Sequence, residues 1–219
     1  MKRAAVYWAP SRSDPLWAAG CAWLGRDAES GAPCPQPPLP GIAELTAVAR
    51  RYGFHATLRP PVRLATHWDE FREAVRDVAR ATKPFALPPL EIAEIGGFLA
   101  LREAAPCPAL QDLADRCVAA TNPHCLPPSA EEYARRRAAG LSPPQEGMLQ
   151  RWGYPYVMEE WFFHLTLSRR LSAGERQTVR MCAAAHFESV LDGPRSIDDI
   201  AIFTQGDGDF RIAERFLLG

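Results

Sequence analysis

The sequence predicts a mixed fold of helices and strands, arranged as two similar halves, and three observations lead to this prediction. Stretches with strand and helix patterns alternate along the 219 residues. The order strand, helix, strand occurs twice. Each occurrence begins with nearly the same five-residue sequence, FHATL at residues 54–58 and FHLTL at residues 163–167. We therefore expect two lobes of one plan, related by a pseudo-twofold axis.

The first half alternates predicted strands and helices. Proline at the first helical position after the cap candidate Asp14 marks the start of one helix, and a loop with five prolines at residues 29–41 ends regular structure after it. Phe71, Val75 and Val78 recur at helical spacing in a later one. We predict strands at residues 4–10, 51–61 and 90–102, and helices at residues 14–25, 42–51 and 68–82.

The second half repeats this order after a helical insert. Residues 108–152 have helical patterns, including a capping box from Ser129 to Glu132. Predicted strands at residues 161–171 and 196–205 then flank a helix at residues 173–191. We expect a single domain over residues 1–219, with a first lobe at about 42–107 and a second at about 153–219. The N-terminal strand and the helical insert at about 108–152 complete the domain.

Composition limits the classes of partner. The formal net charge is −1 and the isoelectric point about 6.5, so long nucleic acid is not expected, whereas a small anionic ligand is compatible. Six cysteines form no C-x-x-C pair and are expected to be reduced thiols. No signal peptide or long apolar stretch is found, which predicts a cytoplasmic protein without a membrane partner. The oligomeric state stays open.

The H-x-T-L motif is the most specific signal in the chain. Five histidines and eight threonines would give roughly 0.2 H-x-T triplets by chance, but two are present. Both follow phenylalanine and precede leucine, at equivalent places of the repeat. A single copy would indicate an exposed strand face, whereas two copies in register favour a site.

The spacing of the motif gives it a chemical meaning. Residues i and i+2 of a strand project from the same face, so each strand offers an imidazole and a hydroxyl to one ligand. One neutral imidazole accepts a proton from a nucleophile while a protonated one donates to a leaving group. Threonine hydroxyls donate to phosphate oxygens. This chemistry uses no metal and no cofactor. The apolar neighbours should be buried: Phe54, Ala56, Leu58, Phe163, Leu165 and Leu167.

These motifs resemble the 2H phosphoesterase superfamily, which is defined by two H-x-[ST]-x motifs. The matching residues are His55, Thr57, His164 and Thr166. The stretches YGFHATLRPP, GGFLALR and WGYPYVMEEWFFHLTL, with the opening AAVYWAP, are similar to a DUF1045-like branch found among bacterial phosphonate-utilisation genes. The resemblance implies an α+β fold with two antiparallel sheets around a central cleft, and phosphodiesterase activity carried by these four catalytic residues.

Three further residues are candidates for substrate binding. Arg59 continues the polar face of its strand and would hold a second phosphate at the cleft rim; a plain surface position is the alternative. Tyr7 and Tyr154 resemble positions where relatives place aromatics near the ligand, and core packing is the alternative for both. The arginines at 135–137 are interpreted as a solvated helix face.

Three functions are compatible with these residues. The first is a metal-independent phosphodiesterase acting on a small cyclic phosphate, which the family context suggests is a ribose cyclic phosphate of phosphonate degradation. The second is an RNA-end enzyme, a 2′,3′-cyclic phosphodiesterase or 2′,5′ RNA ligase-like protein. The third is a nucleotide-binding module without turnover, which would not need two proton carriers. The sequence does not assign which histidine is the acid and which the base.

Overall fold

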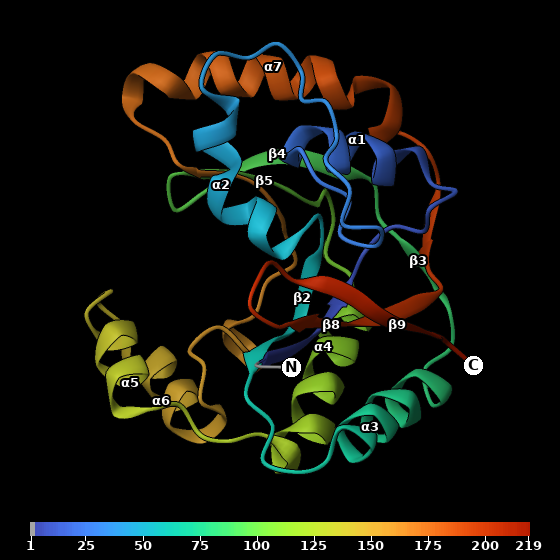
Figure 1. Ribbon diagram of the computed structural model, residues 1–219, viewed down its shortest axis with the longest axis vertical. Coiled ribbons are helices and arrows are strands. Elements are labelled where there is room, and N and C mark those ends of the chain that lie inside the picture. Colours follow the sequence, from blue (N-terminus) through green and yellow to red (C-terminus); the bar gives the residue numbers. More distant parts are fainter. Residues whose placement is uncertain (1–2) are drawn as a thin grey trace.

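The computed structural model describes residues 3–219, and Figure 1 shows how their helices and strands are arranged. The strands are β1 (Arg3–Trp8), β2 (Ala56–Val62), β3 (Phe85–Leu87), β4 (Leu90–Ile95), β5 (Phe98–Glu103), β6 (Leu165–Arg170), β7 (Arg195–Ile197), β8 (Asp199–Gln205) and β9 (Arg211–Leu217). The α-helices are α1 (Pro15–Leu24), α2 (Ile42–Tyr52), α3 (Trp68–Arg80), α4 (Pro108–Thr121), α5 (Ala130–Arg137), α6 (Pro143–Trp152) and α7 (Ala173–Leu191).

Seven strands form one antiparallel sheet in the order β4-β5-β6-β2-β1-β8-β9. The neighbouring strands β6 and β2 carry the H-x-T motifs and meet at the pair Ala56 and Leu165. This short junction leaves two parts, β4-β5-β6 and β2-β1-β8-β9, joined where both histidines enter the sheet. The fold is α+β with antiparallel strands, as the sequence predicts.

The internal repeat is visible in the order of elements. After each H-x-T strand come one helix, one short strand and a hairpin: β2, α3, β3, β4, β5 in the first copy and β6, α7, β7, β8, β9 in the second. The short strands β3 and β7 of the two copies pair with each other.

The two copies exchange their hairpins within the sheet. Strand β5 of the first copy pairs with β6 of the second, and β8 pairs with β1, which lies beside β2. Each part of the sheet therefore draws strands from both expected lobe ranges, 42–107 and 153–219. The N-terminal strand β1 connects the two copies here, because it pairs with β2 on one side and with β8 on the other.

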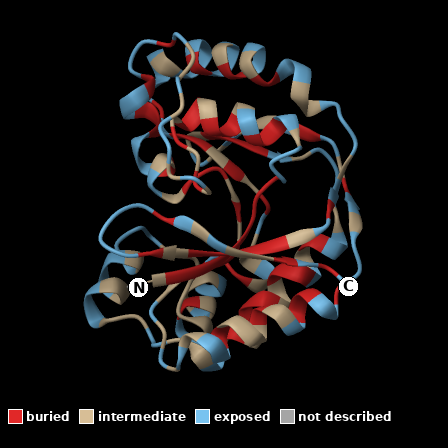
Figure 2. Ribbon diagram, turned by 45° about the vertical axis from the view of Figure 1, so that its right-hand side comes forward, coloured by how far each residue is buried: buried red, intermediate tan, exposed pale blue. Residues whose placement is uncertain are grey.

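Helices cover the two parts separately. In the lower half of Figure 1, α3 packs on β8 and β9, and α4 packs on α3 and β2. In the upper half, α2 packs on β6, α7 contacts β4, and α1 lies between α2 and α7. Figure 2 shows that burial is concentrated on the strands and on the helix sides that face them.

The alternation predicted around each motif is confirmed. The six apolar neighbours are at most 1% exposed: Phe54, Ala56, Leu58, Phe163, Leu165 and Leu167. The predicted helix starts are also confirmed, since Asp14 Oδ1 accepts from Leu16 N at 2.9 Å and Ser129 forms a capping box with Glu132. The sequence pattern therefore fixes which side of each motif strand faces the core.

The prediction of one strand at residues 90–102 is wrong, because this stretch is the hairpin β4-β5. Gly96 and Gly97 have φ of 54° and 91°, and Ile95 pairs directly with Phe98. A two-residue turn with positive φ at both positions matches strand twist, and glycine adopts it at little cost. Strands β3 and β9 are further elements that the sequence pattern does not predict.

Candidate active site

His55 is held at the entrance of β2 by backbone and ring contacts. Its Nδ1 lies 2.8 Å from the carbonyl oxygen of Gly53, the residue that ends α2 with φ 83°. Its ring stacks on Tyr7 of β1, with centroids 3.7 Å apart and an interplanar angle of 22°. Its Nε2 lies 3.2 Å from Thr57 Oγ1. The imidazole is therefore fixed on both edges and on one face.

His164 has the same backbone partner at the entrance of β6. Its Nδ1 lies 3.2 Å from the carbonyl oxygen of Phe162, again the residue two positions earlier. Its ring stacks on Phe162 with centroids 4.8 Å apart, and Phe98 lies at 5.8 Å. When Nδ1–H donates to this carbonyl, Nε2 keeps its lone pair and is the nitrogen left for a ligand.

A cleft of about 570 Å³ lies over the two motif strands. Three of the four motif residues line it, His55, Thr57 and Thr166. His164 is not among the lining residues, but its charge reaches His55 and lowers the pKa of that imidazole. The volume suits a ligand of nucleotide size or smaller.

Burial lowers the pKa of both histidines. For His55 the pKa falls to about 4, mainly by desolvation of the imidazolium; repulsion from His164 adds to this and the Gly53 carbonyl opposes it. For His164 desolvation also lowers the pKa, and the Phe162 carbonyl opposes it. Of the two, only His55 lies under a stacked tyrosine, and the free protein holds its imidazole neutral at neutral pH.

Arg59 does not lie at the cleft rim, where period-two alternation would place it. Tyr7 pairs with Thr57, but Val6 pairs with Arg59, so a β-bulge inserts one residue into β2. Cross-strand partners share a face, so the bulge turns Arg59 to the face of Val6, which belongs to the core. Arg59 is 2% exposed there and donates to Asn122 Oδ1 at 3.3 Å.

Tyr7 and Tyr154 both line the cleft. Tyr7 is 1% exposed and packs on Phe203 as well as on His55, so it serves the core and the site together. Tyr154 lies under the guanidinium of Arg136, 5.2 Å from ring centroid to Cζ. Burial raises the pKa of both phenols, so both remain neutral donors at neutral pH.

The sequence patterns do not predict several of the residues that line the cleft. Arg3 lies four positions before Tyr7 in β1 and therefore on the same face of the strand. Strand alternation could have predicted its place in the cleft. Arg135 and Arg136 also line the cleft, whereas Arg137 pairs with Glu146 at 2.7 Å outside it. Arg135 and Arg137 are exposed, as the interpretation of a solvated face predicts, whereas Arg136 is half-buried against the ring of Tyr154. The helical pattern does not show where α5 lies.

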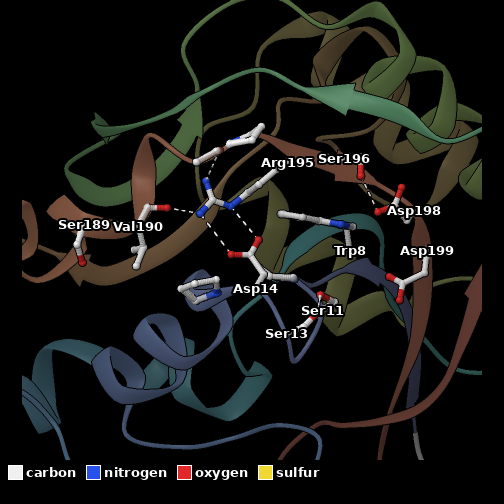
Figure 3. Close-up of a pocket in the computed structure, with 14 residues that line it drawn as sticks. Trp8, Ser11, Ser13, Asp14, Ser189, Val190, Arg195, Ser196, Asp198 and Asp199 are labelled. Atoms are coloured by element: carbon white, nitrogen blue, oxygen red, sulfur yellow. Dashed lines mark hydrogen bonds and ion pairs between the residues drawn. The ribbon is translucent and has the colours of Figure 1, made fainter.

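A second pocket, shown in Figure 3, lies between residues 8–15 and residues 189–199 and contains neither motif. Its charged groups already have partners within the protein. Arg195 Nε lies 2.9 Å from Asp14 Oδ2, and Ser196 Oγ donates to Asp198 Oδ2 at 2.6 Å. With these groups paired, the cleft over the motifs is the stronger candidate for a reaction site.

Within residues 3–219, no group of three or more His, Cys, Asp or Glu side chains is arranged to hold a metal ion. Over the same residues, no helix combines the length and apolar character needed to span a bilayer.

Comparison with known proteins gives a family and two kinds of relative. A family model described as "Protein of unknown function (DUF1045)" matches residues 57–211. Two proteins named ribose 1,5-bisphosphate phosphokinase PhnN are similar: one from Janthinobacterium sp. is 38% identical over 213 residues, and one from Laribacter hongkongensis is 35% identical over 207. The matches cover 92% and 93% of this chain but only 47% and 48% of the relatives' own length. This chain therefore spans about half of each relative.

Solved structures similar to this chain have low sequence identity to it. One is described as a phosphoesterase, with 12% identity, a TM-score of 0.46, and coverage of 99% of this chain and 98% of that one. Another is E. coli LigT in complex with 3′-AMP, with 13% identity, a TM-score of 0.44 and the same coverage.

Proposed function

Because the chain belongs to the DUF1045 family and carries two H-x-T motifs at one junction of its sheet, we propose that it is a 2H-type, metal-independent phosphodiesterase that hydrolyses a small cyclic phosphate. The observation that carries the proposal is the repeated histidine geometry. In both motifs Nδ1 faces the carbonyl of residue i−2, which leaves Nε2 for proton transfer.

The proposal assigns different roles to the two histidines. His55 has a pKa of about 4, is neutral at neutral pH and acts as the general base, taking a proton from the attacking water. His164 acts as the general acid and gives its proton to the leaving oxygen. The water oxygen forms a bond to phosphorus as the P–O bond to the leaving group breaks.

The hydroxyl groups stabilise the charge that develops on phosphorus. Thr57 and Thr166 line the cleft from the two motif strands and donate to the non-bridging oxygens. In the free protein Thr57 Oγ1 lies 3.2 Å from His55 Nε2, so a bound phosphate oxygen would replace this contact. Tyr7 keeps the His55 ring in one plane by stacking on it.

Two observations support a phosphorylated ribose as the substrate class. The cleft has a volume of about 570 Å³, which suits a small ligand, and several cationic side chains on its walls favour an anion: Arg3, Arg135, Arg136, Arg169 and Arg170. The two relatives, whose own length this chain covers to 47% and 48%, are named for a phosphorylated ribose. We therefore propose a ribose cyclic phosphate of phosphonate degradation as the substrate.

A turnover screen tests this function. Purified protein is incubated with cyclic ribose phosphates, 2′,3′-cyclic nucleotides and short RNAs that end in a 2′,3′-cyclic phosphate, and ring opening is followed by phosphorus NMR. We expect ring opening of the small cyclic ribose phosphates, and no turnover by a folded variant lacking both histidines. Turnover confined to RNA ends would replace the proposal by the RNA-end function. Binding without turnover of any substrate would show a binding module.

A further inference from the structure

Arg59 is a buried cation without a counter-charge. It is 2% exposed, and no carboxylate among residues 3–219 forms an ion pair with it. Its guanidinium donates to Asn122 Oδ1 at 3.3 Å and to the carbonyl of Trp152 at 3.4 Å, both long hydrogen bonds, and it also hydrogen-bonds the sulfur of Cys125. Arginine does not lose its proton in proteins, and an unpaired buried charge is strongly unfavourable. A negative charge at this position would remove that cost.

A second donor lies beside it. Arg59 Nε and Trp152 Nε1 are both buried and have no hydrogen-bond partner within the described chain. Neither group accepts hydrogen bonds, so they cannot satisfy each other. Both residues line the same cavity of about 30 Å³. Two donors at one cavity require an acceptor that comes from outside the chain.

The walls of this cavity are positively charged. Arg3, Arg63 and Arg136 line it together with Arg59, and Glu132 is the one acidic residue among the described lining residues. The Glu132 carboxylate already accepts from Ser129 N at 2.8 Å and pairs with Arg63 at 3.2 Å. The remaining charge is positive, which selects an anion over a neutral acceptor.

We propose that this cavity binds one halide-sized anion, held by Arg59 and the Trp152 indole. A volume of about 30 Å³ accommodates about one water molecule or one monatomic anion, and it is too small for a phosphate group. Arg59 comes from β2, Asn122 follows α4 and Trp152 ends α6, so the anion joins the motif strand to the helical insert. The inference does not depend on the proposed hydrolysis.

Thermal unfolding of the full chain tests the site, with chloride and bromide as probes. Either halide is titrated against gluconate at constant ionic strength. Because a ligand stabilises the state that binds it, Tm should change little below the dissociation constant and then rise by roughly 3–6 °C for each tenfold increase in halide concentration above it. Bromide should also give an anomalous diffraction peak at Arg59.

Two variants and one control separate anion binding from a general salt effect. Arg59→Met keeps the stem of the side chain and should abolish the halide-dependent rise. Trp152→Phe removes only the indole donor and should weaken it, which keeps the test valid if the first variant does not fold. The control Arg63→Met removes a half-exposed cation of the same wall and should retain it. An equal rise in wild type, Trp152→Phe and the control, or no halide dependence at all, would overturn the proposal.

Discussion

At the scale of single residues, the site depends on a contact that each histidine makes with its own chain. The carbonyls of Gly53 and Phe162 lie 2.8 and 3.2 Å from the two Nδ1 atoms, so the chain before each motif determines which ring nitrogen is left for a ligand. The motif letters predict the histidine and the threonine but not this anchoring. The stacking of Tyr7 on His55 likewise needs β1 beside β2, which no local pattern shows.

Removal of either imidazole should have a large effect on rate. We expect His55→Ala and His164→Ala each to lower kcat by about 10²- to 10⁴-fold, the usual contribution of a positioned acid or base. Thr57→Val and Thr166→Val should each cost about 10²-fold through lost phosphate stabilisation. Steady-state kinetics on the best substrate of the screen measure this, with the exposed His67→Ala as control. A folded His164→Ala protein with wild-type kcat would contradict the mechanism.

The pH dependence of kcat/KM should reflect two lowered pKa values. The base His55 must be neutral, so activity falls as pH decreases toward about 4. The acid His164 must be protonated, and burial lowers its pKa below 6.5. Activity therefore falls again as pH increases through the lowered pKa of His164. We expect a bell with its maximum below pH 6.5, whose apparent pKa values belong to the pair. A maximum above pH 7 would rule out this assignment.

At the scale of elements, the sequence predicts local structure better than it predicts strand pairing. Alternation around each motif gives the buried residues correctly because side-chain direction in a strand is local. Alternation fails at Arg59, because a bulge between β1 and β2 depends on the partner strand. It also misses the exchange of the β4-β5 and β8-β9 hairpins, since the repeat shows which elements are equivalent but not which strands pair.

Helix α1 supports His55 through a close contact at Gly20. A Cβ on Gly20 would lie 2.2 Å from the ring of Phe54, the residue before His55. We expect Gly20→Ala to lower the free energy of unfolding by about 1–3 kcal/mol, because the buried ring must move, and to lower kcat with it. Urea unfolding measures the first effect.

Gly147 in α6 is a matched control for this substitution. A Cβ there meets nothing within 4 Å. Gly147→Ala should therefore raise the free energy of unfolding by up to about 1 kcal/mol through helix propensity alone. If both variants were equally stable, the proposed contact between Gly20 and Phe54 would not govern the position of the motif strand.

At the scale of the whole molecule, charge is distributed unevenly. The net charge of −1 gives the protein no overall attraction for anions. Five arginines nevertheless line one cleft. Sequence composition predicts the first property and misses the second, because the clustered arginines come from β1, α5 and β6, which only the fold brings together. The proposed binding of a small anion therefore depends on the charge of the cleft and not on the net charge of the protein.

The neutral, buried state of His55 should also make global stability depend on pH. In the unfolded chain this imidazole binds a proton near pH 6.5, whereas in the folded protein its pKa is about 4. Between these values the unfolded state holds more protons, so the contribution of His55 to stability is complete above pH 6.5 and is lost as pH falls toward 4.

Replacement of His55 isolates this effect from the titration of other groups. We expect the difference in free energy of unfolding between pH 7.5 and pH 4.5 to be smaller in His55→Gln than in wild type, because glutamine does not titrate. His67→Gln, which removes an exposed imidazole, should keep the wild-type difference. Urea unfolding at both pH values gives the comparison. If His55→Gln lost as much stability on acidification as wild type, the imidazole would be free to take up a proton in the folded state, and its assignment as the neutral general base would fail with it.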